Sequence, residues 1–188
     1  VVYTVRPGKI NHPARSQEMK IRDLVALDSD TYRSLWRFVA SHDMVGLVSW
    51  ANAPLDDPAP ELFAEPRMLH AEDREGVWLR IVDVEQALAE RGYNSHGTLK
   101  IAIAADALAP WNEGVFELTV NEGGTQVAKV SGDADISLSV KTLALLYAGR
   151  HTPLRLAGMG LIEGSDEALQ TTAMLFQTRF APHAPDHF

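Results

Sequence analysis

Cysteine is absent from this sequence of 188 residues, which excludes disulfide bonds, thiol nucleophiles and metal sites built on thiolates. Long apolar runs are absent as well, and none approaches the roughly 20 residues that a membrane-spanning helix needs. The chain also opens without a charged segment followed by an apolar one, the pattern of a secretory leader. We therefore expect a soluble, cytoplasmic protein with no membrane partner.

Basic residues are fewer than acidic residues in this sequence. The sequence has 17 Lys and Arg against 25 Asp and Glu, which gives a formal net charge of −8 at pH 7. This field repels a phosphate backbone, so we expect no nucleic-acid partner. The apolar fraction of 46% is that of an ordinary globular protein.

Apolar periodicity and turn residues predict an α+β fold. The first part should contain a helix over 31–41 and strands at 1–5, 19–27 and 44–50. A proline-rich stretch at 52–66 follows and is the best candidate for a domain boundary. Beyond it we predict an antiparallel sheet of about five strands with helices on one face. Its strands should lie at 77–84, 99–103, 116–120, 126–130 and 136–140.

Helices of the second part should begin at Asp83 and Ser165, two N-caps, and span about 141–148 and 153–157. The sequence begins inside a strand-like alternation, Val1–Val5, without a methionine. We therefore expect the chain to be the C-terminal part of something longer.

Two motifs could carry chemistry, and neither is self-sufficient. Arg155–Gly160 fits the R-x-x-G-x-G pattern that cradles the pyrophosphate of coenzyme A, but a helix runs into its glycines where one should begin. We interpret these glycines as a helix C-cap. His183 and His187 are four residues apart, yet Pro185 prevents the helical face that would aim both rings at one ion, so we expect no metal site.

Tryptophan-centred segments carry a resemblance. They are L-W-R-F-V-A-S-H-D at Leu35–Asp43 and V-W-L-R-I-V-D-V at Val77–Val84, followed by Ala87-Leu88 and Arg91-Gly92-Tyr93. Asp135–Leu138, Leu145–Gly149, Leu156–Gly160 and the terminal Phe188 complete the series. In order and spacing, from Val1 to Phe188, these segments resemble the Eis (enhanced intracellular survival) type of GNAT-superfamily N-acetyltransferases.

The resemblance implies a division of the chain. Residues 1–66 would be the later half of a central GNAT-like lobe, and residues 67–188 a sterol-carrier-protein-like C-terminal domain. The N-terminal GNAT lobe that binds acetyl-CoA would lie upstream of Val1. Acetyl-CoA would then be the co-substrate of the full-length enzyme and would not bind this chain alone, so the isolated chain should be inactive. The resemblance also implies amine substrates and a homo-oligomer, a hexamer.

Three site residues follow from the resemblance. In Eis-type enzymes the terminal carboxylate acts as the base toward the substrate amine, which corresponds to Phe188 here. His187 stands where the family often has an acidic residue, and we assign it to substrate binding. Asp83 corresponds to an acid that lines the substrate pocket, and its other role, as the N-cap of the following helix, is equally open.

Two alternatives belong to other function classes. Sterol-carrier-like domains elsewhere enclose lipid, so the chain could be a free-standing carrier of a lipid or other small ligand, which would show an unusually apolar cavity. It could also be a purely structural lobe that shapes the pocket and builds the oligomer.

Overall fold

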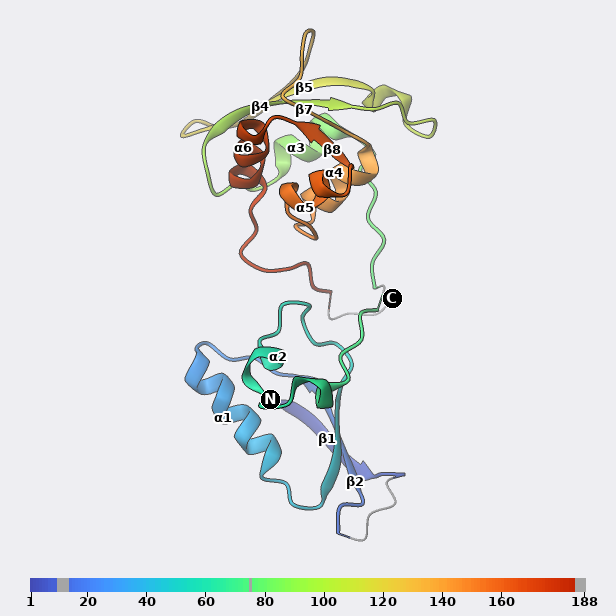
Figure 1. The fold of residues 1–188 in the computed structure, drawn as a ribbon, viewed down its shortest axis with the longest axis vertical. Coiled ribbons are helices and arrows are strands. Elements are labelled where there is room, and N and C mark those ends of the chain that lie inside the picture. The colour runs from blue at the N-terminus through green and yellow to red at the C-terminus, as the bar shows by residue number, and fades with distance from the viewer. Residues whose placement is uncertain (10–13, 75, 185–188) are drawn as a thin grey trace. The chain divides into compact units, whose positions relative to one another are not determined.

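The computed structural model describes residues 1–9, 14–74 and 76–184, which form two compact units with separate hydrophobic cores. Val1–His70 belong to the N-terminal unit and Ala71–His183 form the C-terminal unit (Figure 1). The division expected at 66 and 67 falls within a short 3-10 turn, Pro66–Leu69. Among the described residues, no helix is long and apolar enough to cross a membrane.

The N-terminal unit is a three-stranded sheet with helices. Its elements are β1 (Val2–Pro7), β2 (Gln17–Asp23), α1 (Ser29–Ala40), β3 (Val45–Trp50) and the short α2 (Ala59–Leu62). β2 pairs antiparallel with β1 and parallel with β3. A parallel pair needs a crossover connection, and α1 supplies it. The predicted strand at 19–27 is too long, because β2 ends at Asp23 and Leu27 is exposed.

α1 begins two residues before the predicted start at 31, directly after its N-cap Asp28. The Asp28 carboxylate accepts a hydrogen bond from the Thr31 amide at 2.7 Å and so caps the first turn. Tyr32 and Val39 are buried on the face of the helix that packs with β2 and β3. The shared core consists of Met19, Ile21, Leu24, Tyr32, Val39 and Val45. Helical spacing of apolar residues therefore fixes which face of α1 covers the sheet.

The C-terminal unit is a five-stranded sheet in the order β6-β5-β4-β7-β8, with its helices on one face (Figure 1). Its strands are β4 (Gly97–Ile103), β5 (Gly114–Asn121), β6 (Gly124–Val130), β7 (Ile136–Leu138) and β8 (Ile162–Gly164). Its helices are α3 (Val84–Glu90), α4 (Val140–Tyr147), α5 (Pro153–Gly158) and α6 (Asp166–Phe176). Alternate residues of β4 and β5 are buried, as expected when one face of a sheet covers a core.

Two details of the predicted sheet are wrong. β4 and β7 pair parallel, so the sheet is mixed and not antiparallel throughout. The segment predicted as a strand at 77–84 forms no strand: its backbone is irregular, Trp78 is 86% exposed, and only Ile81 and Val84 are buried. β8 supplies the fifth strand instead. An apolar run bounded by turns has the same sequence pattern whether the segment is a strand within a sheet or an irregular segment that packs on another surface.

Candidate functional site

Asp83 lies at the start of α3, as the sequence predicts. Its Oδ1 accepts a hydrogen bond from the Gln86 amide at 2.9 Å, and its backbone is extended, which is the geometry of an N-cap. The side chain is exposed, and Oδ2 makes no hydrogen bond to any residue of the described ranges. One oxygen therefore holds the helix while the other stays open to a ligand. The two roles considered for Asp83 are compatible.

Asn112 fixes the backbone on both sides of Asp83. Its Oδ1 accepts from the Val84 amide at 3.0 Å, and its Nδ2 donates to the Val82 carbonyl at 2.9 Å. The side chain is only 2% exposed, and its bond to the Val84 amide is buried, which shields that bond from water. The indole Nε1 of Trp111 donates to the same Val82 carbonyl at 2.8 Å. Asp83 therefore projects from a backbone that is held before any ligand arrives.

The sequence alone did not single out Asn112. It sits in a short 3-10 turn, Pro110–Asn112, and its partners are 28 and 30 residues away along the chain. No local pattern marks such a contact, because the fold creates it by bringing the turn against the start of α3.

Exposed aromatic and apolar side chains accompany this carboxylate. Trp111 is 58% exposed although its indole nitrogen is bonded to Val82, and Val82 itself is exposed. Arg80 pairs with Asp106, which ties the segment before Asp83 to the loop before the Trp111 turn. A carboxylate near an exposed indole suits a cationic amine, which a carboxylate attracts and an aromatic face stabilises.

The other predicted site residues are not placed here. His187 and Phe188 lie outside the described residues. His183 is exposed, and the part of the chain that the structure describes holds no group of three or more residues fit to bind a metal ion.

Arg155–Gly160 does not fit the pyrophosphate of coenzyme A. The segment ends α5 and leads into β8, so no helix begins at its glycines. The Met159 amide donates to the Arg155 carbonyl at 3.2 Å, and Gly160 has φ +69°, the left-handed conformation of a helix C-cap. The C-cap interpretation is confirmed.

The inner face of the C-terminal sheet is filled by side chains. Leu99, Ile101, Leu118, Ile136 and Leu143 are at most 1% exposed. One hollow of this unit measures about 360 Å³, opens to solvent, and is lined by residues 102–104 and 137–139, by Thr142, and by Gly160, Leu161 and Glu163. A lipid carrier would need an enclosed apolar space, and this hollow is not one.

Replacing Asn112 by alanine removes both bonds around Asp83 and leaves the buried Val84 amide without this partner, while the Val82 carbonyl keeps its bond from the Trp111 indole. We expect the free energy of unfolding to fall by about 2 kcal/mol, the scale of unsatisfied buried polar groups. Urea denaturation of Asn112→Ala measures it. Asn94→Ala, which removes an exposed asparagine of the same unit, is the matched control and should change stability little. An equal effect of the two substitutions would contradict the role given to Asn112.

Known families match both units. A family described as an acetyltransferase (GNAT) domain matches residues 1–81, and one described as a sterol carrier protein domain matches residues 84–185. An uncharacterized N-acetyltransferase of Streptomyces griseus is 33% identical over 171 residues, which are 89% of this chain and 40% of that protein. The N-acetyltransferase Eis of Mycobacterium tuberculosis is 28% identical over 151 residues, 80% of this chain and 36% of that protein.

Solved structures with a similar fold include relatives of the same kind. Eis1 from Mycobacterium abscessus superposes with a TM-score of 0.77 at 31% identity, over 99% of this chain and 48% of that chain. A GCN5-related N-acetyltransferase from Anabaena variabilis also gives 0.77, at 30% identity, over 99% of this chain and 46% of that one. The chain thus spans less than half the length of these relatives. It belongs to the Eis-like GNAT N-acetyltransferase family, of which it contains a GNAT-related region and a sterol carrier protein domain.

Proposed function

We propose that this chain is the C-terminal portion of an acetyl-CoA-dependent N-acetyltransferase that acts on amines, and that it shapes the amine pocket. The observation that carries the proposal is Asp83, a carboxylate that caps α3 with one oxygen and leaves the other free. Its backbone is held on both sides by Asn112. A site that is already ordered binds a cation more tightly than one that must first be ordered, because the ordering itself costs free energy.

The terminal carboxylate of Phe188 is the proposed base. The amine nitrogen forms a bond to the acetyl carbon of the thioester, the carbon–sulfur bond breaks, and Phe188 takes the proton that the nitrogen loses. The departing thiolate receives a proton from an acid of the acetyl-CoA-binding lobe. His187, next to this carboxylate in the sequence, is proposed to contact the substrate. Both assignments rest on the family relationship.

Acetyl-CoA binding is assigned to the N-terminal GNAT lobe that the proposal places upstream. The one segment of this chain with the matching motif, Arg155–Gly160, is a helix C-cap, so the isolated chain should bind no acetyl-CoA and transfer no acetyl group.

On the basis of the family relationship we propose that residues 1–66 are the later half of a central GNAT-like lobe and that residues 67–188 are the sterol-carrier-like domain. From the family relationship we also propose that the full-length protein forms a homo-oligomer, a hexamer.

Asp83→Asn separates the two roles of this side chain, because asparagine caps a helix about as well as aspartate but carries no charge. In the longer enzyme we expect the KM for a primary amine to rise about tenfold, the scale of a lost charge-assisted contact, with the melting temperature unchanged. Asp166→Asn, in the first turn of α6, is the matched control. An unchanged KM in Asp83→Asn would show that Asp83 is a cap and nothing more.

The alternative of a free-standing lipid carrier has less support. Its requirement is an enclosed apolar cavity, whereas the face between sheet and helices is packed and the hollow of this unit is open.

A further inference from the structure

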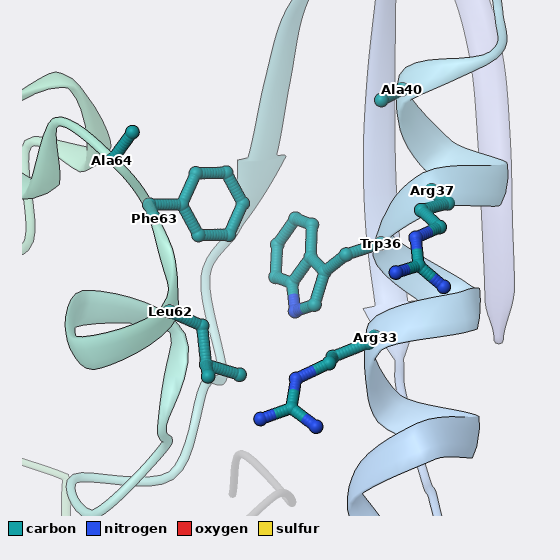
Figure 2. A pocket seen from close by; sticks show the side chains of 7 residues that line it. All are labelled: Arg33, Trp36, Arg37, Ala40, Leu62, Phe63 and Ala64. Carbon is teal, nitrogen blue, oxygen red and sulfur yellow. The ribbon is translucent and has the colours of Figure 1, made fainter.

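The N-terminal unit has a groove that the proposed function does not use. It runs between α1 and the segment that follows α2 and holds about 360 Å³, within the range of small-molecule sites. Figure 2 shows its lining residues: Arg33, Trp36, Arg37, Ala40, Leu62, Phe63 and Ala64. All of them belong to one unit.

Aromatic rings line the groove from both sides, Trp36 from α1 and Phe63 from the end of α2. The rings of Trp36 and Phe63 meet edge to face, with centroids 5.1 Å apart at 90°. The ring centroid of Trp36 also lies 6.3 Å from that of Tyr32 and 6.4 Å from that of Trp50, so two further aromatic rings contact its indole. Phe63 and its neighbour Leu62 are 37% and 40% exposed. An apolar group entering the groove would cover surface that water now contacts.

The α1 side of the groove, which carries Trp36, is also cationic. Arg33 and Arg37 are one turn apart on α1, and Figure 2 shows the Arg33 side chain extending toward Leu62. Arg33 has a weak partner, because its contact with Asp30 is 3.5 Å long and the Asp30 side chain is 94% exposed. The Arg37 guanidinium makes no ion pair or hydrogen bond with any residue in the described ranges.

Tyr32, whose ring contacts that of Trp36, does not neutralise these cations. Burial, together with a 2.6 Å hydrogen bond to Asp57, raises the pKa of Tyr32, so this phenol stays uncharged. The Asp57 carboxylate is itself occupied by the Tyr32 hydroxyl and by the Ala59 amide. Two guanidinium groups therefore face an apolar hollow in a chain whose net charge is −8.

We infer that this groove binds a small aromatic carboxylate. The ring would lie against Trp36 and Phe63, and the carboxylate would accept hydrogen bonds from Arg33 and Arg37. A guanidinium offers a planar pair of donors that matches a carboxylate. This site is independent of the proposed acetyl transfer, and no residue serves both.

The test uses the 188-residue chain and two probes of the same shape, 2-naphthoate and the uncharged 2-naphthylmethanol. Nitrogen-15 NMR follows the indole signals, and Trp36→Phe identifies the signal of Trp36 as the one it removes. Naphthoate should shift that signal and bind at least about tenfold more tightly than the alcohol, the scale of two charge-assisted hydrogen bonds.

Variants locate the site. Arg33→Gln and Arg37→Gln should each weaken naphthoate binding about fivefold, as expected for a partly exposed charged contact, and leave alcohol binding unchanged. Ala40→Leu fills the groove from α1 without lowering helix propensity, and should abolish binding of both probes. Arg22→Gln, an exposed arginine of β2, is the matched control. Equal binding of the two probes, or equal effects of Arg37→Gln and Arg22→Gln, would overturn the inference.

Discussion

Arg91→Ala should destabilise the C-terminal unit by about 3 kcal/mol, the scale of several charged hydrogen bonds lost together in a partly buried site. The Arg91 guanidinium donates to the Tyr147 carbonyl at 3.3 Å and to the Phe176 carbonyl at 3.1 Å. These carbonyls belong to the last residues of α4 and α6, which have no partner within their own helices. One side chain thus caps two helices.

Aromatic rings enclose the same guanidinium. Its carbon lies 4.9 Å from the ring centroid of Tyr93, 5.0 Å from that of Phe176 and 5.9 Å from that of Tyr147. Burial raises the pKa of Tyr93, so its phenol is neutral at neutral pH, and it lowers the pKa of Arg91, whose guanidinium still remains a cation because its ordinary pKa is very high. Cation–π contacts gain strength where water is excluded, which adds to the expected loss.

Urea denaturation of the 188-residue chain measures this effect. Arg179→Ala is the matched control, because Arg179 stacks on Phe180, which is 66% exposed, and should contribute little. Arg91→Lys keeps the charge but loses the planar set of donors, and should lie between the wild type and Arg91→Ala. If Arg91→Ala were no less stable than Arg179→Ala, the role assigned to Arg91 would be wrong.

Moving the terminal carboxylate should have the largest effect on catalysis. Adding a single glycine after Phe188 keeps every side chain and displaces the carboxylate by one residue. In the longer enzyme we expect kcat to fall at least about 100-fold, the lower range for loss of a general base. Steady-state acetyl transfer to a primary amine measures it.

A second variant separates the carboxylate from its side chain. Phe188→Leu keeps the carboxylate in place and should retain most of kcat, whereas a large loss would assign the effect to the aromatic ring. An unchanged kcat in the glycine-extended enzyme would remove Phe188 as the base and leave the role of Asp83 to be judged separately.

Local sequence patterns predicted most elements of the fold. Asp83 and Ser165 each accept a hydrogen bond from the amide three residues on, as predicted, because capping depends on residues only three positions apart. The alternations that predict β4 and β5 were also sufficient, since one face of each strand covers a core and the other does not.

Contacts between residues far apart in the sequence could not be predicted from local patterns. The apolar segment 77–84 has the composition of a buried strand, but it is the Asn112 side chain, not a neighbouring strand, that bonds to the backbone at Val82 and Val84. Arg91 was part of a recognisable motif, yet its partners at 147 and 176 are fixed only by the packing of α4 and α6. Sequence alone therefore predicted the N-cap role of Asp83 but not the Asn112 contacts that hold the backbone beside it.

The most direct test of the account is acetyl transfer from acetyl-CoA to a primary amine, measured for the 188-residue chain and for the longer polypeptide that the proposal requires. An antibody raised against this chain would first identify that polypeptide by its mass in the source cells. The account predicts transfer by the longer protein and none by the 188-residue chain. Transfer by the 188-residue chain alone, or a source-cell protein of only about 20.6 kDa, would contradict it.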